Sequence, residues 1–275
     1  MQDRRPTSKV KEPKVVASDH ALAYKRCVAA NLYDHPDLYD LLLPVGTHLP
    51  FYVDLARQQA GPVLELACGT GQLTIPIAQT GLITAGVDQS TAMLDRARAR
   101  ASAANVLVDF VHADMRNFDV GRQFSFVFVA RNSLLHLHST QELRSVFAAV
   151  KRHLAPRGLF VFDVFNPDVR LLARTPGHRF PVMEVTETPL GNLSVEGTHD
   201  YDPAAQVDHG TWFVSVSGHR DALVFPLSIR SIFPQELPLL VSACGFELID
   251  RFGDVSREPF GPQSPRQICV CRAAR

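Results

Sequence analysis

The stretch Val63-Leu-Glu-Leu-Ala-Cys-Gly-Thr-Gly-Gln-Leu-Thr74 decides the fold of this chain. It begins with a short apolar run, Val63–Leu66, and continues into a tight turn that contains Gly69 and Gly71. A helical segment follows from about Leu73 to Gln79. Glycines let the backbone approach a ligand where a Cβ atom would clash. A strand, a glycine turn and a helix in this order predict half of a nucleoside-binding α/β fold.

An acidic residue, Asp88, follows Gly71 by 17 residues and ends a second apolar run. An acid at this place in a nucleoside-binding fold can accept hydrogen bonds from both hydroxyls of a ribose. The ligand need not be a dinucleotide, because Thr74 stands where the dinucleotide fingerprint has its third glycine. The start of the helix carries no lysine for a phosphate, which excludes a P-loop.

Segments of strand and helix type alternate from residue 62 to residue 165. The predicted strands cover 62–66, 83–88, 107–112, 124–130 and 158–165, and the predicted helices cover 72–80, 90–103 and 139–154. Near-continuous apolar runs such as 124–129 suit strands that are covered on both faces. This alternation predicts right-handed crossovers and a mostly parallel sheet, with ligands at the carboxyl ends of its strands.

The pattern differs on either side of this region. The polar composition of residues 1–20 predicts a disordered tail. Residues 21–60 predict an N-terminal helical cap, with helices at Ala21–Leu32, Leu38–Leu43 and Phe51–Gln59. The insertion 170–230 predicts antiparallel strands at 180–188, 193–201, 206–216 and 219–229, because short Val-, Thr- and Phe-rich segments alternate there with turn residues. The α/β pattern returns with a predicted helix at 234–244 and strands at 246–252 and 266–272.

Composition limits the classes of function. The 275 residues include 28 basic and 28 acidic side chains, so no excess of positive charge points to nucleic acid. No apolar run approaches the roughly 20 residues of a membrane span, and the basic N-terminus lacks the apolar stretch of a signal peptide. The 5 cysteines have neither C-x-x-C nor zinc spacing, so we predict free thiols in a reducing cytoplasm and no metal site.

The run Glu65-Leu-Ala-Cys-Gly-Thr-Gly71 resembles motif I of class I S-adenosylmethionine-dependent methyltransferases. The resemblance implies S-adenosyl-L-methionine as the cofactor. It also implies a Rossmann-like domain, 61–169 and 231–275, with a mostly parallel seven-stranded sheet and helices on both faces. The turn backbone would meet the methionine part of the cofactor, and Asp88 would hold the ribose. Within this family, the chain resembles the small-molecule N-methyltransferase-like subfamily. That subfamily places a small antiparallel sheet over its active site, so we expect residues 170–230 to act as a lid.

The resemblance extends to further cofactor contacts. Asp114 and Met115 follow the third strand, where an acid of the family accepts a hydrogen bond from the adenine amino group and the next backbone amide meets a ring nitrogen. Arg131 follows the fourth strand, where the family contacts the adenine or the methionine end; this planar cation could also hold an acceptor carboxylate or lie solvated at the rim. The predicted cofactor-binding residues are Glu65, Ala67, Gly69, Gly71, Asp88, Gln89, Met93, Asp114, Met115 and Arg131.

The segment Asn132-Ser-Leu-Leu-His-Leu137 is similar to one in small-molecule N-methyltransferases, including those that dimethylate amino sugars. The resemblance places His136 near the acceptor. Methyl transfer to nitrogen needs a free lone pair, and a neutral imidazole can take the proton of an ammonium group near pH 7. A structural histidine bonded to backbone is the alternative, and His112 and His138 lie close by.

An N-terminal tyrosine is a second catalytic candidate. Tyr39, in Leu38-Tyr-Asp-Leu-Leu42, resembles a family tyrosine that folds over the sulfonium of the cofactor. The dipeptide Tyr33-Asp34 repeats the pattern 6 residues earlier, which leaves the choice between the two tyrosines open. Ordinary packing of both residues on amphipathic helices is an equal alternative.

These observations predict a methyltransferase that transfers a methyl group to a small-molecule acceptor, with nitrogen favoured, in specialised metabolism. An O- or C-methyltransferase and a non-catalytic nucleoside-binding module are the alternatives. A redox enzyme ranks lower, because Thr74 breaks the dinucleotide pattern. Neutral charge and the expected lid favour a small molecule over nucleic acid. The acceptor and the oligomeric state stay open, with a homodimer as one option.

Overall fold

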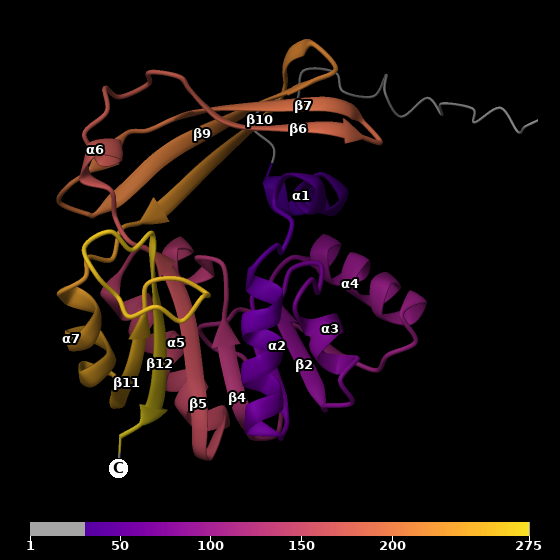
Figure 1. Ribbon diagram of the computed structural model, residues 1–275, viewed down its shortest axis with the longest axis vertical. Coiled ribbons are helices and arrows are strands. Elements are labelled where there is room, and N and C mark those ends of the chain that lie inside the picture. The colour runs from indigo at the N-terminus through magenta and orange to yellow at the C-terminus, as the bar shows by residue number, and fades with distance from the viewer. Residues whose placement is uncertain (1–30, 275) are drawn as a thin grey trace, which may run out of the picture.

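The computed structural model describes residues 31–274 and shows two β-sheets, one above the other (Figure 1). The predicted tail at 1–20, all but the last two residues of the predicted helix Ala21–Leu32, and Cys27 lie outside the described residues. Among residues 31–274, no helix is both long and apolar enough to cross a membrane.

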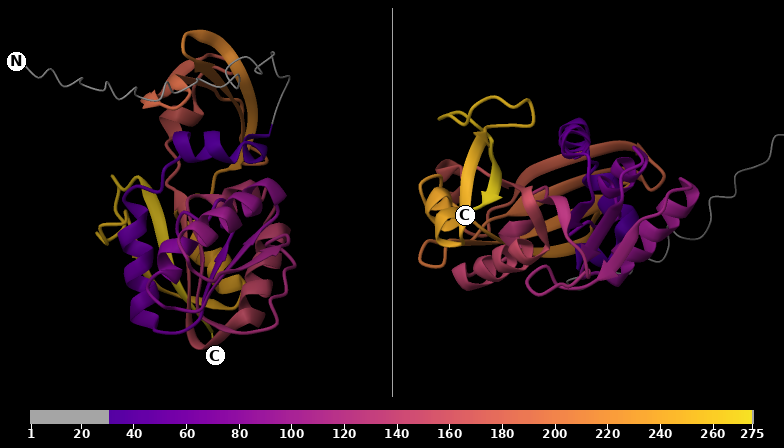
Figure 2. Two further views of the ribbon diagram at one scale, coloured as in Figure 1. Left: turned by 90° about the vertical axis from the view of Figure 1, so that its right-hand side faces the viewer. Right: turned by 90° about the horizontal axis from the view of Figure 1, so that it is seen from below.

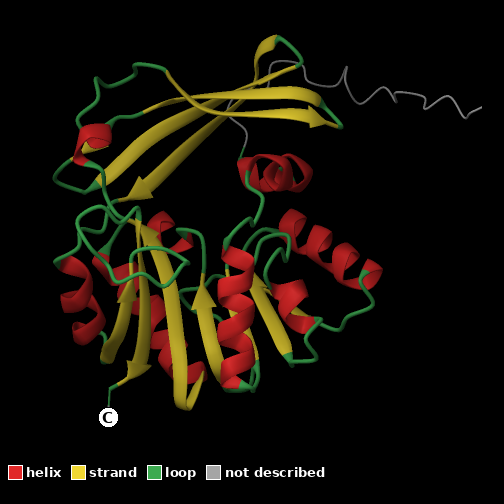
Figure 3. Ribbon diagram, viewed as in Figure 1, coloured by secondary structure: helices red, strands yellow, loops and turns green. Residues whose placement is uncertain are grey.

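The larger sheet forms from strands and helices that alternate along the chain (Figure 3). Its strands are β1 (Val63–Leu66), β2 (Thr84–Asp88), β3 (Asp109–His112), β4 (Phe124–Val129), β5 (Leu154–Phe165), β11 (Phe246–Phe252) and β12 (Arg266–Ala273). The helices between them are α3 (Thr74–Ala78), α4 (Thr91–Ala103), η3 (Ser133–His136), α5 (Thr140–His153) and α7 (Glu236–Ala243).

The strand order of this sheet is β11-β12-β5-β4-β1-β2-β3. The five strands β1 to β5 pair in parallel, and β12 pairs antiparallel with both β5 and β11. The chain leaves β1 toward β2 on one side, whereas β4 occupies its other side. The glycine turn after β1 therefore lies where the strand order reverses, which is the place where open α/β sheets bind ligands.

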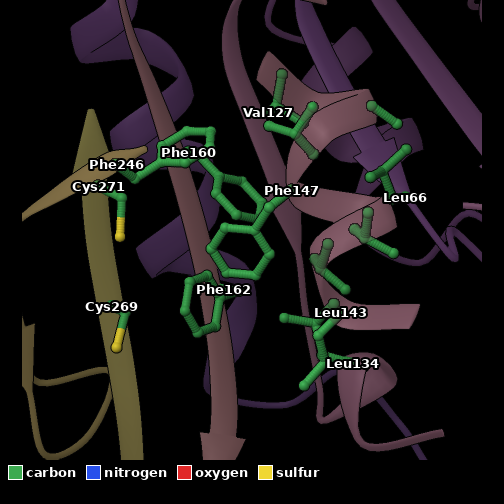
Figure 4. Packing of buried hydrophobic residues seen from close by; sticks show 14 of the residues in the cluster. Leu66, Val127, Leu134, Leu143, Phe147, Phe160, Phe162, Phe246, Cys269 and Cys271 are labelled. Carbon is green, nitrogen blue, oxygen red and sulfur yellow. The ribbon is translucent and has the colours of Figure 1, made fainter. Parts of the chain in front are cut away.

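Helices cover both faces of the larger sheet. On one face, α2 (His48–Gln59) and α3 pack with Phe51, Tyr52 and Ile77 against β1, β4 and β5. On the other face, α5 and α7 pack against the same strands. In Figure 4, Phe147 of α5 lies among Phe160, Phe162 and Phe246. Its ring centroid is 5.2–5.6 Å from theirs, in edge-to-face contacts that add to area burial.

The second sheet is antiparallel, with the order β10-β9-β7-β6 and β8 paired to β9. Its strands are β6 (Phe180–Thr188), β7 (Gly191–Thr198), β8 (Tyr201–Asp202), β9 (Val207–Val216) and β10 (His219–Arg230), and α6 (Val169–Leu172) leads into it. We call it the upper sheet. Figure 2 shows α1 (Pro36–Leu42) between the two sheets. The expected helical cap thus divides, because α2 covers the larger sheet while α1 and η2 (Leu32–Asp34) pack under the upper one.

The predicted fold class is confirmed, and three of the differences from the predicted boundaries concern the pairing of strands. β3 begins at Asp109, which lies opposite Ala85 of β2, and Leu107, which precedes this ladder, is 96% exposed. β5 begins at Leu154, four residues earlier than predicted, by pairing with Phe124 of β4. The predicted strand 193–201 divides into β7 and β8 because the ladder with β9 is interrupted.

Candidate active site

Three residues of the glycine turn after β1 have a backbone conformation in the left-handed region. The φ angles of Ala67, Gly69 and Gly71 are 53°, 53° and 75°. A Cβ atom on Gly71 would come within 2.9 Å of Ile75 Cδ1, so this position excludes larger residues on two grounds. Ala67 accepts the same conformation at a cost, because it has a Cβ atom.

Asp88 ends β2 and is tied to the glycine turn. Its Oδ2 accepts a hydrogen bond from Gly69 N at 2.8 Å, and its Oδ1 accepts one from Ser90 N at 2.8 Å. Burial raises the pKa of the Asp88 carboxyl, and the hydrogen bonds from Ser90 and Gly69 oppose this shift. Each carboxylate oxygen keeps a further lone pair. The carboxylate thus lies beside the turn, where the sequence predicts the ribose.

Glu65 points from β1 into a small cavity under the same turn. The cavity is lined by Tyr39, Glu65, Ala67, Cys68, Thr70, Gln72, Leu73, Ala130, Arg131 and Ser133. The Glu65 carboxyl is 4% exposed and accepts a hydrogen bond from Thr74 Oγ1. Burial raises its pKa to about 8, against the opposing effects of Thr74 and Arg131. The Glu65 carboxyl group in this cavity is therefore mostly neutral at pH 7.

Arg131 follows β4 and forms the opposite wall of the cavity. Its guanidinium donates from Nη2 to the Leu43 carbonyl at 2.6 Å and lies over the Tyr39 ring, 5.7 Å from the centroid. Its backbone N donates to Asp163 Oδ1 at 2.8 Å. Arg131 is half-buried, so it is held between elements and is not a solvated rim residue.

The remaining predicted cofactor residues lie along the same edge of the sheet. Asp114 follows β3, but its carboxylate is already paired with Arg116, whose Nη2 lies 2.6 Å from Oδ2. Hydrogen bonds from Arg116 lower the pKa of Asp114, so this carboxylate stays ionised. Met115 is half-buried against the core, Met93 is 1% exposed, and Gln89 is exposed at the surface.

Tyr33 and His136 form a contact that the sequence did not single out. The Tyr33 hydroxyl lies 2.7 Å from His136 Nε2, and their rings meet edge-on with centroids 5.5 Å apart. Burial lowers the pKa of His136 and raises that of Tyr33, so the neutral forms dominate near pH 7. We therefore assign the Tyr33 hydroxyl as donor to Nε2, which leaves the imidazole proton on Nδ1. The repeated Tyr-Asp dipeptide was the signal that pointed to Tyr33.

Tyr39 and Tyr33 occupy different places in the site. The Tyr39 ring lines the Glu65 cavity, and its centroid is 6.0 Å from that of Tyr33. The next residue, Asp40, fastens α1 to the glycine turn by accepting from Thr70 Oγ1 at 2.5 Å and from Gln72 Nε2 at 2.7 Å. The segments η2 and α1 therefore close over the carboxyl ends of β2 and β1. His112 and His138 instead bond to backbone carbonyls, those of Gln89 and Ser228.

Comparisons with known proteins agree with this geometry. Residues 63–158 match a family described as "Methyltransferase domain". The CcbJ methyltransferase from Streptomyces caelestis has a similar structure, with a TM-score of 0.75 and 29% identity over 89% of this chain and 99% of that chain. The cypemycin N-terminal methyltransferase of Streptomyces sp is 29% identical over 236 residues, which cover 85% of this chain and 92% of that protein.

One further relative has a nitrogen acceptor in its name. The dTDP-3-amino-3,4,6-trideoxy-alpha-D-glucopyranose N,N-dimethyltransferase of Streptomyces venezuelae is 33% identical over 138 residues, or 47% of this chain and 56% of that protein. The chain spans about half the length of this and of other curated relatives. The fold, the matched residues and the similar structures agree with the resemblance in the glycine turn. The chain therefore carries a methyltransferase domain of the class I, S-adenosylmethionine-dependent family.

Proposed function

We propose that this protein transfers a methyl group from S-adenosyl-L-methionine to a nitrogen of a small molecule. The observation that carries the proposal is the meeting of the glycine turn, Asp88, Asp114 and Arg131 at the carboxyl ends of four neighbouring parallel strands. The cofactor supplies a sulfonium methyl group for in-line displacement. The protein's part is to align the two reactants and to exclude water.

The two ends of the site suit the two ends of this cofactor. Asp88 can accept from the ribose hydroxyls, and the Asp114–Met115 segment is the proposed adenine contact. Glu65 and Arg131 face one cavity, so Glu65 can hold an α-ammonium group while Arg131 can hold a carboxylate. The charges of this pair of side chains complement the ammonium and carboxylate groups of an amino-acid end.

The nitrogen acceptor must lose a proton before it can attack. We propose that the Tyr33 hydroxyl takes this proton while it passes its own proton to His136 Nε2. The Tyr33 ring lies near both the His136 ring and the Tyr39 ring, and Tyr39 lines the cavity. Imidazole is the stronger base of the pair near pH 7, and it therefore holds the proton during transfer. Tyr39 would form the wall beside the reacting methyl group.

Three observations favour nitrogen and a small acceptor. The chain is similar to proteins that are named as an N,N-dimethyltransferase and an N-terminal methyltransferase. The neutral Tyr33–His136 pair provides a proton acceptor, which transfer to an ammonium group requires. The upper sheet stands above the larger sheet, and as the proposed lid it would restrict access for a macromolecule (Figure 1). We assign residues 170–230 to this lid and the two flanking segments to the cofactor domain.

Calorimetry with S-adenosylhomocysteine tests the cofactor site, and a methyl-labelled cofactor with separate panels of amines, phenols and carbon acids tests the reaction. We expect binding of the demethylated cofactor and label transfer in the amine panel. Folded protein that gives no heat with S-adenosylhomocysteine would refute the cofactor assignment. Label in the phenol or carbon-acid panel alone would favour an O- or C-methyltransferase. Binding without transfer in any panel would favour a nucleoside-binding module.

A further inference from the structure

We call the face of the upper sheet that packs on α1 the underside. One part of the underside is buried, and the other part is half-exposed. One row across the strands, Val195, Val214 and Leu223, is buried against α1. The next row on the same face contains Gly197, Trp212 and Phe225; Phe225 is buried, whereas Trp212 is only half-buried. Residues alternate between faces along a strand, so the rows beyond Trp212 continue this underside away from α1.

A stacked group of side chains covers the half-exposed part. A Cβ atom on Gly197 would lie 3.2 Å from Phe180 Cζ, which places the Phe180 ring on the underside. The His199 ring stacks on Phe180 with 3° between their planes and 4.8 Å between their centroids. The Arg174 guanidinium lies over Phe180, 4.2 Å from its centroid. His199 is therefore fixed in its plane by an aromatic neighbour.

Asp208 fixes the His199 ring in a second way. Its Oδ2 is hydrogen-bonded to His199 Nδ1, and its Oδ1 accepts from Asp200 N at 3.1 Å. A carboxylate accepts from Nδ1–H, so the Nε2 atom of the neutral imidazole is left with a lone pair. Among the described residues, no hydrogen bond occupies His199 Nε2. A half-buried carboxylate that orients a histidine through its Nδ1–H is a feature of binding and catalytic sites.

β10, an edge strand of the upper sheet, contacts two segments of the candidate active site. His138, two residues after His136, places its Nε2 3.1 Å from the Ser228 carbonyl of β10. His35, two residues after Tyr33, packs edge-on against Phe225 at 5.7 Å. Leu227, between these two contact points on β10, is half-buried. The upper sheet is thus joined to both segments that carry the Tyr33–His136 pair.

We propose that His199 Nε2 accepts a hydrogen bond from a hydroxyl group of the acceptor, while Trp212 and Leu227 contact an apolar ring face of the same molecule. The proposal rests on the proposed function and defines its substrate class as a hydroxylated cyclic amine. Asp208 and Phe180 act by holding the imidazole in place. A site that orients a polar group discriminates strongly against analogues that lack its partner.

A matched pair of probes tests the proposal: cyclohexylamine and trans-4-aminocyclohexanol, which differ by one hydroxyl group. Dissociation constants are measured by NMR titration of the protein saturated with S-adenosylhomocysteine. We expect the parent protein to prefer the hydroxylated probe by about fivefold to tenfold, the range of one hydrogen bond. His199→Gln is expected to lose this preference. The control is His209→Gln, on the opposite face of β9, where the preference should persist.

The outcomes distinguish failure of this proposal from failure of the proposed function. An equal preference in His199→Gln, or binding of neither probe to the saturated parent protein, would overturn the proposal and leave the cofactor assignment standing. Failure of S-adenosylhomocysteine to bind the parent protein would overturn both. Unchanged S-adenosylhomocysteine affinity in both variants shows that the site is folded. If His199→Gln does not fold, Asp208→Asn replaces it, and a preference as large as that of the parent protein would count against the proposal.

Discussion

Cofactor binding is predicted to depend on pH through Glu65. The buried carboxyl has a pKa of about 8, so at pH 7 it is mostly protonated in the free protein. An α-ammonium group placed beside it favours the ionised form, because an opposite charge nearby lowers the pKa of an acid. Binding should therefore release a proton, and affinity should rise as the pH rises toward 8. The cost of ionising Glu65 at pH 7 is about 1.4 kcal/mol, one pKa unit.

The size of the effect follows from the same pKa. If Glu65 is ionised in the complex throughout, the affinity for S-adenosylhomocysteine should rise about ninefold from pH 6 to pH 7. The α-amino group of the ligand stays protonated over this range, since such groups titrate near pH 8. Burial lowers the pKa of His136, which moves the titration of this histidine toward lower pH. Glu65→Gln removes the titrating group and keeps an oxygen that can accept from Thr74 Oγ1.

Isothermal titration calorimetry at pH 6 and pH 7, in two buffers of different ionisation enthalpy, measures both the affinity and the protons released. We expect nearly one proton per ligand at pH 7 for the parent protein and none for Glu65→Gln. An affinity of the parent protein that does not change with pH, or an equal change with pH for the variant, would refute the assignment of Glu65 to the ammonium group.

The dependence of stability on pH offers a second check. The folded pKa lies above the unfolded value of 4.5, so the contribution of Glu65 is present below pH 4.5 and lost as the pH rises through 8. The melting temperature of Glu65→Gln should therefore exceed that of the parent protein most at high pH.

Three further predictions concern the turn, the proton acceptor and the core. Tyr33→Phe and His136→Ala should each lower the single-turnover rate of methyl transfer by about 10²-fold or more, with the dissociation constant of S-adenosylhomocysteine nearly unchanged; an equal loss of cofactor affinity would count against a role in proton transfer. Gly71→Ala should abolish measurable S-adenosylhomocysteine binding by calorimetry, since its φ of 75° and the Ile75 contact both oppose a Cβ atom; binding at parental affinity would contradict this reading. Phe147→Ala should lower the free energy of unfolding by about 3–5 kcal/mol in urea titrations, because its fully buried ring contacts three other phenylalanines; a loss below about 1 kcal/mol would show that the core collapses around the gap.

The order of the elements could be predicted because each strand and helix carries its own periodic pattern. The glycine turn, Asp88 and Asp114 lie within 52 positions of Val63 and end strands that are neighbours in the sheet. Position at a strand end determines which edge of the sheet a residue occupies, so their convergence follows from topology alone. The sequence therefore predicted where these backbone segments lie.

Side-chain partners were harder to predict. Asp114 pairs with Arg116, two residues away, although the family resemblance directed attention to adenine. Tyr33 meets His136 across 103 positions, and no local pattern reports such a contact. The repeated Tyr-Asp dipeptide reduced the choice to two tyrosines, and only the path of η2 and α1 decides which one reaches the histidine. Contacts of this kind depend on the direction of a side chain as well as on its element.

Asp163 shows why part of the site depends on a residue outside it. Arg131 and Asn132 follow β4 with φ angles of 58° and 66°, a conformation that costs about 1 kcal/mol or more for each non-glycine residue. Asp163, fully buried at the end of β5, accepts from Arg131 N at 2.8 Å and from the Tyr52 hydroxyl at 2.6 Å. The Arg266 guanidinium lies 3.4 Å from its other oxygen.

This arrangement compensates the strain of the turn after β4. The Asp163 carboxylate is available to the Arg131 amide only because β4 and β5 are parallel neighbours, with Val129 opposite Phe162. The turn then projects the Arg131 guanidinium back over Tyr39 into the Glu65 cavity. A buried carboxylate without its donors would be costly, so Tyr52 and Arg266 are required for Asp163 to remain there. The position of Arg131 in the cavity is therefore determined by packing on β5, and the pattern around Arg131 itself contains no sign of it.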